Sequence, residues 1–352
     1  MSRTRAPAIN AALLAAVDTH PRDLTRTVAE KMGVSRQAVA ARIRTLVDAG
    51  YLARSGTTRP AYVRGVRREG SFRHALKGLA EDRVWSNEVA PMLQGLPANL
   101  LDIAHHGLTE MVNNAIDHSE GQRLRVVARR DAQRVSLWVI DDGIGIFRKI
   151  ARALGLPDER LALLELSKGK FTTDPRRHTG EGVFFTSRMF DNFQILSGDL
   201  VFDHDDAEKD DLLYDVDAPR SRHGTTVFMS IGLLSERTAK QVFDEYSSGP
   251  DDYDFARTVV PVRLAKVGDE NLVSRSQAKR LMQRVDKFRC VVLDFDGVGM
   301  IGQAFADEVF RVFANAHPHV DLGVMHAVPD VQQMIRRAEV ARDKDNGQLP
   351  LI

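Results

Sequence analysis

Residues 108–119, LTEMVNNAIDHS, predict an amphipathic helix whose polar face carries more than solubilising side chains. On a helical wheel Asn114 lies about 40° from Glu110, and Asp117 lies about 20° to its other side, so the three share one face. The apolar residues spread over the opposite face, where they must pack on a core. The polar face therefore either meets water, as on an ordinary surface helix, or lines a pocket.

A second stretch, VSLWVIDDGIGI at residues 135–146, predicts a buried strand that ends in a carboxylate and two glycines. Asp141 at the mouth of the strand can accept a hydrogen bond from an amino group. Gly143 and Gly145 would let the backbone approach a planar ligand closely. Asp-Gly is also a common turn dipeptide, so a plain turn is the alternative.

A third stretch, HTGEGVFF at residues 178–185, predicts a glycine turn that opens a helix. Free backbone N–H groups and the helix dipole at such a start can hold phosphate, and a simple loop-to-helix turn is the alternative. The chain contains no G-x-x-x-x-G-K-[ST] loop, and the glycines at 143 and 145 lack the third glycine of a dinucleotide fingerprint. Those two nucleotide-binding folds are therefore not expected.

Taken in this order, the three stretches resemble the N, G1 and G2 boxes of the GHKL ATPase superfamily of gyrase, heat-shock chaperone, histidine kinase and mismatch-repair proteins, over roughly residues 102–231. The resemblance implies ATP and Mg²⁺ as cofactors. It implies Glu110 as the base that activates water, Asn114 as the Mg²⁺ ligand and Asp141 as the carboxylate that reads adenine. The other residues that it places at the nucleotide are Asp117, Gly143, Gly145, Thr179, Gly180, Gly182 and, in the last box, Thr225.

Residues 147–177, between the second and third boxes, are expected to form a lid over the nucleotide. Its basic side chains can meet phosphate charge or simply be solvated, and they are Lys168, Lys170, Arg176 and Arg177.

Composition gives a soluble globular profile: 352 residues, 43% hydrophobic and 28% charged, enough for two or three domains with their own cores. No membrane span is visible, Asn10 interrupts the apolar run near the N-terminus, and a cytoplasmic protein is expected. Cys290, the single cysteine, excludes an intrachain disulfide and sits in an apolar run typical of a core.

Charge is segregated along the chain. Residues 1–68 hold 13 Lys or Arg against 4 Asp or Glu, a net charge of +9, whereas residues 69–352 hold 36 against 44, a net charge of −8. Helices are predicted at residues 8–17, 24–32 and 36–49, followed by a β-hairpin at 51–63.

This pattern resembles the winged helix-turn-helix of bacterial transcription regulators, with double-stranded DNA as the implied partner and protein docking as the alternative. Recognition-helix residues expected at DNA are Arg36, Gln37, Arg42 and Arg44. Arg54 and Arg59 on the wing would reach phosphate.

Residues 69–100 are expected to form a connector with one helix near 71–82, and Trp85, Leu93 and Leu96 to pack against the next domain. The acidic stretch at 203–217 lies between strands expected at 194–202 and 225–231, and predicts a solvated hairpin insertion or, less simply, a metal site.

Strands and helices alternate from residue 259 to 345, as in an α/β layer. The run VVLDFDGVGMI at 291–301 resembles the STAS-like domains, relatives of anti-sigma-factor antagonists. In those antagonists a serine takes phosphate, and the corresponding places here are Gly302 and Gln303, which have no hydroxyl. Four apolar residues of the following helix are expected in the core: Phe305, Val309, Phe310 and Phe313.

The sequence thus predicts an α+β multidomain protein. It consists of a winged helix (1–68), a connector (69–100), a GHKL α/β sandwich (101–245), a linker (246–258) and a STAS-like α/β domain (259–345). The leading hypothesis is an ATP-binding, slowly hydrolysing regulator that controls a DNA-binding head and a tail able to dock a protein. The alternatives are an anti-sigma-factor-type serine kinase and a non-enzymatic, ATP-dependent adaptor, and a homodimer is compatible with each.

Overall fold

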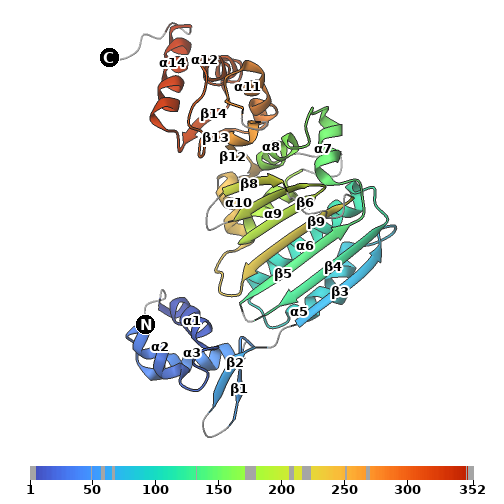
Figure 1. The fold of residues 1–352 in the computed structure, drawn as a ribbon, viewed down its shortest axis with the longest axis vertical. Coiled ribbons are helices and arrows are strands. Elements are labelled where there is room, and N and C mark those ends of the chain that lie inside the picture. Colours follow the sequence, from blue (N-terminus) through green and yellow to red (C-terminus); the bar gives the residue numbers. More distant parts are fainter. Residues whose placement is uncertain are drawn as a thin grey trace.

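The structure, a computed structural model, describes residues 5–48, 50–56, 60–65, 68–131, 133–170, 180–205, 210–215, 223–249, 252–266, 270–345 and 347. Its parts follow the chain: a small helical head, a broad sheet with helices on one side, and a small α/β tail (Figure 1). The head and the tail lie at opposite ends of the central part, so the two termini are far apart (Figure 1).

The head has the predicted winged-helix elements. The second helix ends at Gly33, whose φ of 61° is the left-handed conformation that glycine favours, and Ser35 Oγ accepts from the Ala38 N–H at 3.2 Å to open the third. The elements are α1 (Arg5–Ala16), α2 (Leu24–Met32), α3 (Arg36–Asp48), β1 (Leu52–Ser55) and β2 (Ala61–Arg64), the last two antiparallel.

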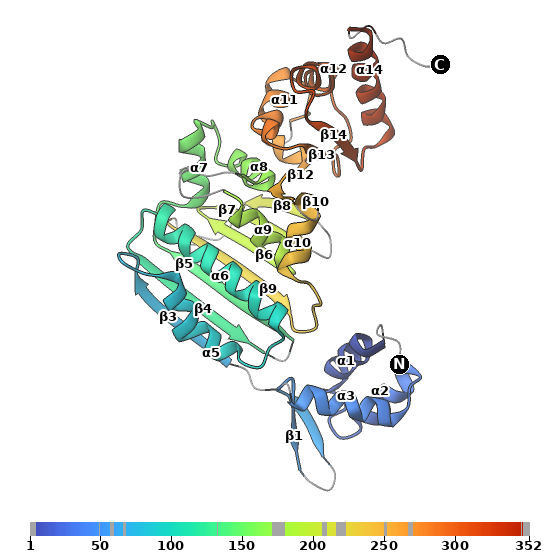
Figure 2. The ribbon, with the colours of Figure 1, turned by 180° about the vertical axis from the view of Figure 1, so that it is seen from behind.

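The central part is a seven-stranded sheet in the order β3-β4-β5-β9-β6-β7-β8, and all of its neighbouring strands are antiparallel. Its strands are β3 (Arg68–Ala75), β4 (Arg123–Arg130), β5 (Arg134–Asp141), β6 (Asn192–Ser197), β7 (Leu200–Asp205), β8 (Asp210–Asp215) and β9 (Thr225–Gly232). Figure 2 shows the helices lying across one face. They include α5 (Ala90–Leu93), α6 (Ala98–His118), α9 (Gly182–Met189) and α10 (Ala239–Tyr246).

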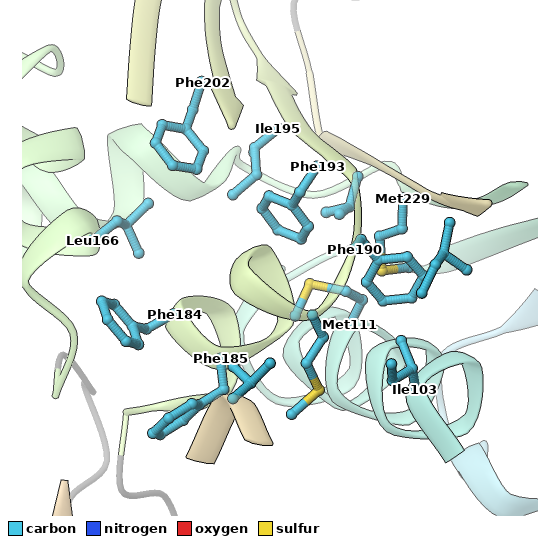
Figure 3. Packing of buried hydrophobic residues seen from close by; sticks show 14 of the residues in the cluster. Ile103, Met111, Leu166, Phe184, Phe185, Phe190, Phe193, Ile195, Phe202 and Met229 are labelled. Carbon is cyan, nitrogen blue, oxygen red and sulfur yellow. The ribbon is translucent and has the colours of Figure 1, made fainter. Parts of the chain in front are cut away.

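Aromatic and aliphatic side chains fill the space between these helices and the sheet (Figure 3). Phe190, Phe193 and Ile195 have no exposed surface. Helix α6 passes so close to them that a Cβ at Gly107 would lie 2.4 Å from the Phe190 ring. Helix α6, which carries Glu110 and Asn114, is therefore packed tightly on this apolar core.

The prediction of a helix near residues 71–82 is wrong, because the edge strand β3 runs to Ala75 and the next helix begins only at Glu81. Phe72 and His74 are partly buried and alternate with exposed Ser71 and Arg73, a strand pattern that the polar outer face hides in the sequence. Three short helical turns follow: α4 (Glu81–Val84), the π-helical η1 (Trp85–Val89) and α5. The expected packing residues are confirmed, since Leu93 and Leu96 are buried and Trp85 lies 4.8 Å from the His105 ring.

The single strand expected at 194–202 is two strands, β6 and β7, which reverse at Gly198 with a φ of 61°. The acidic stretch that follows supplies the end of β7 and all of β8, so part of it belongs to the sheet. In the described part of the chain no group of three or more His, Cys, Asp or Glu side chains is placed to hold a metal ion.

The tail has a three-stranded parallel sheet, β12-β13-β14, as the alternation of strands and helices predicted. Phe305, Val309 and Phe310 are buried as expected, Phe313 packs against the core, and Cys290 is only partly buried. Its elements are β12 (Arg257–Pro261), η2 (Val262–Ala265), α11 (Arg275–Met282), η3 (Val285–Lys287), β13 (Cys290–Asp294), α12 (Gln303–Asp307), η4 (Glu308–Phe313), α13 (Ala314–Ala316), β14 (Asp321–Met325) and α14 (Pro329–Asp345).

The segment expected as a linker carries a small hairpin, β10 (Ser247–Gly249) and β11 (Asp252–Phe255). Within the described ranges, no helix has the length and apolar character needed to cross a bilayer.

Candidate functional site

A cavity of about 270 Å³ lies between α6, the ends of β5 and β9, and the start of α9. Apolar side chains such as Met111, Ile195 and Val227 form much of its wall. The residues singled out from the sequence that the structure brings together in its lining are Glu110, Asn114, Asp141, Gly145, Gly180, Gly182 and Thr225.

Asp141 ends β5, and its carboxylate is held by backbone donors. Its Oδ1 accepts from the N–H of Gly143 at 2.8 Å and from the N–H of Thr225 at 3.2 Å. Burial raises the pKa of the Asp141 carboxyl above its ordinary value of 3.8, and these two hydrogen bonds oppose the rise. Because both donors meet Oδ1, the other oxygen remains the one suited to a ligand donor.

The turn after β5 is locked by a side chain from β9. Thr225 Oγ1 accepts from the Ile146 N–H at 3.1 Å, which ties the start of α7 (Ile146–Leu154) to the sheet. Gly145 has a φ of 92°, and a Cβ there would lie 2.5 Å from Ser197 Oγ, so only glycine fits. Gly143 packs on the Ser119 carbonyl and reaches the site through its N–H rather than by lining the cavity.

Glu110 faces the first turn of α9 across a very short gap. A Cβ added to Gly182 would lie 2.0 Å from Glu110 Oε2, so the glycine makes the space that this carboxylate occupies. The start of α9 also offers backbone N–H groups with no partner inside the helix. A carboxylate and a helix N-terminus are thereby placed side by side at the cavity.

Asn114 presents an unmet polar group to the cavity. Its Nδ2 atom is buried and has no hydrogen-bond partner among the residues that the structure describes. Buried amides are normally hydrogen-bonded, and the two ends of an amide can exchange by a flip of the side chain. The site therefore fits a polar or ionic ligand that this amide contacts.

Three polar lining residues were not among those predicted from the sequence: His118, Ser119 and Lys149. The Lys149 ammonium donates to the His118 carbonyl at 2.7 Å and to Glu120 Oε1 at 3.1 Å. Its position four residues after Gly145, on the first turns of a helix, is the signal that would have pointed to it.

Asp117, expected at the nucleotide, is exposed and does not line the cavity. The lining face of α6 centres on Asn114, His118 and Met111, which puts Asp117 about 90° away around the helix. The polar face that the helical wheel predicted for α6 therefore coincides only in part with the face of α6 that lines the cavity.

Lys168 and Lys170 were expected to meet the phosphates, but neither lines the cavity. The Lys168 ammonium lies 2.7 Å from Glu165 Oε1 within α8 (Leu161–Lys168) and donates to the carbonyl of Gln283 at 2.9 Å. The Lys170 ammonium lies 5.1 Å from the centroid of the Phe288 ring in the tail. Neither is placed at phosphate here, and Thr179, Arg176 and Arg177 lie outside the described residues.

On the head, Arg36, Gln37 and Arg44 are exposed along α3. Arg42 is different, because its Nε donates to Asn10 Oδ1 of α1 at 3.0 Å and Asn10 is buried. This hydrogen bond links α3 to α1, a role that the sequence did not predict for Arg42. Arg54 is exposed on β1, and Arg59 lies outside the described residues.

Comparison with protein families assigns each part. Residues 6–59 match the MarR family, residues 100–232 match the histidine kinase-, DNA gyrase B-, and HSP90-like ATPases, and residues 277–332 match a STAS-like domain of unknown function (DUF4325). A search for relatives among curated proteins finds no match. The chain thus combines a MarR-type winged helix-turn-helix, a GHKL-type ATPase domain and a STAS-like domain.

Proposed function

We propose that the chain is an ATP-binding regulatory protein that hydrolyses ATP slowly, and whose nucleotide state controls its head and its tail. The observation that carries the proposal is the pocket, which Asp141, Asn114 and Glu110 all line. An apolar wall suits a purine ring, while the polar groups at its two ends suit an amino group and a phosphate chain.

At the purine end, Oδ2 of the Asp141 carboxylate would accept from the exocyclic amino group of adenine, since the two backbone donors meet Oδ1. Asp141 is partly buried, and burial raises the pKa of its carboxyl. In such a site of reduced polarity one well-placed hydrogen bond discriminates more strongly than in water. Thr225 and Gly143 keep the carboxylate in place.

At the phosphate end, Asn114 would hold Mg²⁺ through its amide oxygen, after a flip of the amide. Bound Mg²⁺ supplies positive charge that offsets the phosphates. The backbone at Gly180 and Gly182 and the Lys149 ammonium would contact phosphate oxygens. Glu110 would take a proton from the attacking water, as its place against Gly182 allows.

Two contacts connect this site to the ends of the molecule. The Tyr51 hydroxyl donates to the Leu233 carbonyl at 3.3 Å, just beyond β9, and so joins the head to the sheet that carries Thr225. On the other side Leu166 lines the cavity while Lys168, on the same helix, is bound into the tail. These contacts support control of both ends by the nucleotide.

The test is Mg·ATP binding by calorimetry and turnover by phosphate release, on the full chain with and without DNA. Glu110→Gln keeps the size of the side chain and should retain binding while turnover falls by about 10²–10⁴. Lys240→Ala, an exposed position on α10, is the control. Absence of nucleotide binding by the parent chain would overturn the proposal, and binding without turnover would favour the adaptor.

The kinase alternative has its own outcome in the same experiment. With γ-labelled ATP and candidate partners, stoichiometric label on a partner serine would make the chain a protein kinase. The tail itself offers no hydroxyl at Gly302 or Gln303, where α12 begins.

A further inference from the structure

The face of the central sheet turned away from the helices carries two aromatic side chains at its centre. Trp138 of β5 and Phe228 of β9 are paired in register, and their ring centroids are 4.9 Å apart with 39° between the planes. Both side chains are partly exposed. Figure 1 looks onto this face, and α6 lies behind the strands there and in front of them in Figure 2.

Strand register extends this pair into an apolar stripe. Val127 of β4 is the cross-strand partner of Trp138. Ile140, two residues further along β5, lies on the same face as Trp138. Leu196 of β6 continues the stripe beyond β9, and these three side chains are also partly exposed. An apolar patch of this kind on a sheet face marks an interaction surface more often than open solvent.

Charges are divided between the two sides of the stripe. On the β3 and β4 side, Arg73 and Arg125 are exposed and paired in register. Arg129 lies further along β4 on the same face, with Glu69 as its cross-strand partner and its Nε 3.9 Å from Asp131 Oδ2, so arginines outnumber carboxylates on this side. On the β7 side, Asp203 accepts from Gln194 Nε2 at 3.0 Å and Asp205 accepts from Asn192 Nδ2 at 2.8 Å, so both carboxylates are held on this face.

We infer that this face binds a second copy of the chain. The two copies would be related by a two-fold axis that lies in the interface, next to the central strand β9 and parallel to it. Because β4 and β7 are each two strands from β9, this axis places β4 of one copy over β7 of the other. The arginines of each copy then meet the acidic side of the other, and the Trp138–Phe228 pairs meet at the centre. An axis across the strands would place arginine on arginine, so the charges select the aligned face-to-face packing.

The inference does not depend on nucleotide binding. It does bear on the head, because two winged helices on one symmetric dimer suit two half-sites on DNA.

The first experiment measures the mass of the full-length chain by light scattering and sedimentation over a range of concentrations. The expected result is a dimer, and Trp138→Glu should raise its dissociation constant roughly 30-fold or more, because a central aromatic anchor is replaced by a charge. Val340→Glu on α14, where the side chain is 43% exposed, is the matched control and should leave the dimer unchanged. Thermal melting checks that each variant folds.

The second experiment tests the pairing itself by reversal of charge. Strand register places Arg129 of β4 and Asp205 of β7 at one level along the strands, so the proposed axis brings them together. Arg129→Asp and Asp205→Arg should each weaken self-association, since each homodimer then faces like charges. Mixed in equal amounts, the two variants should recover a heterodimer at the parent's dissociation constant within about threefold, because opposite charges meet again. A parent chain that stays monomeric, or a dimer that Trp138→Glu and both reversals leave unchanged, would overturn the inference.

Discussion

The Lys168 ammonium lies 2.7 Å from Glu165 Oε1, and each side chain is only 1% exposed. The second oxygen of Glu165 accepts from Arg284 of the tail at 3.0 Å, and Lys168 also donates to the carbonyls of Arg280 and Gln283. These contacts satisfy the buried charges and bind helix α8 to the tail.

Removal of one member of this network should be far more damaging than removal of an exposed ion pair. Glu165→Ala leaves the Lys168 ammonium buried without its counter-charge, so we expect the free energy of unfolding to fall by about 3–5 kcal/mol. In Lys168→Met the free energy of unfolding should fall by less, because Glu165 keeps its ion pair with Arg284 and the methionine fills much of the volume of the lysine side chain. Urea unfolding measures both.

Lys240→Ala is the control for this pair of variants. It removes an ion pair with Asp244 in which the lysine is 70% exposed, and should change the free energy of unfolding by about 0–1 kcal/mol. A loss in Glu165→Ala no larger than this would show that the buried pair contributes little.

Gly182→Ala tests the contact between α9 and Glu110. The added methyl group would lie 2.0 Å from Glu110 Oε2, so the carboxylate must move. A displacement of about 1 Å at a reacting group costs on the order of 10² in rate, and we expect ATP turnover to fall by that amount. Steady-state phosphate release measures it. Gly299→Ala, where a methyl group meets no described atom within 4 Å, should keep full turnover, and equal activity in the two variants would contradict the geometry.

Asp141→Asn should separate nucleotide affinity from stability. Loss of the charged acceptor should weaken ATP binding by about tenfold or more, as a hydrogen bond to a charged group contributes about 1.5–3 kcal/mol. Affinity of the parent chain should also decline as pH falls through the raised pKa of Asp141, whereas affinity of the variant should depend less on pH. Calorimetric titration at several pH values measures both trends.

The nucleotide-free protein should respond in the opposite sense. A raised folded-state pKa means that the folded chain binds this proton more tightly than the unfolded chain, so the stability linked to Asp141 is lost as pH rises through that pKa. The asparagine variant lacks this loss and should melt at the same or a higher temperature than the parent at neutral pH. A clearly lower melting temperature would mean that the carboxylate stabilises the fold.

The site was largely predictable because its parts are local in sequence. Glu110 and Asn114 are one helical turn apart, and Asp141 and Gly145 belong to one strand and its turn, so spacing alone puts each pair on one face or edge. Their convergence in one cavity is then a matter of how α6 lies on the sheet.

The contacts that the sequence did not predict involve partners far along the chain. Lys168 finds its carbonyl acceptors more than 110 positions later, and Arg42 finds Asn10 through the packing of α3 on α1. Strand β3 lies at the edge of the sheet and alternates exposed with partly buried side chains, a position that its own sequence does not reveal. Local periodicity cannot distinguish these cases from a solvated lysine, a DNA-facing arginine or a polar connector.

Two arginines of α3 should behave differently in DNA binding, although they are two residues apart. Arg44 is exposed on the face shared with Gln37, so Arg44→Ala should weaken binding by the full-length chain to double-stranded DNA and reduce the slope of log affinity against log salt by about 1. Fluorescence anisotropy at several salt concentrations measures both.

Arg42 holds Asn10 of α1, so Arg42→Ala should instead lower the melting temperature of the head and leave the salt slope unchanged in the protein that remains folded. Asn10→Ala removes the same hydrogen bond from the other side and should reproduce that result. If Arg42→Ala reduced the slope as Arg44→Ala does, while Asn10→Ala did not, Arg42 would have to contact phosphate after all.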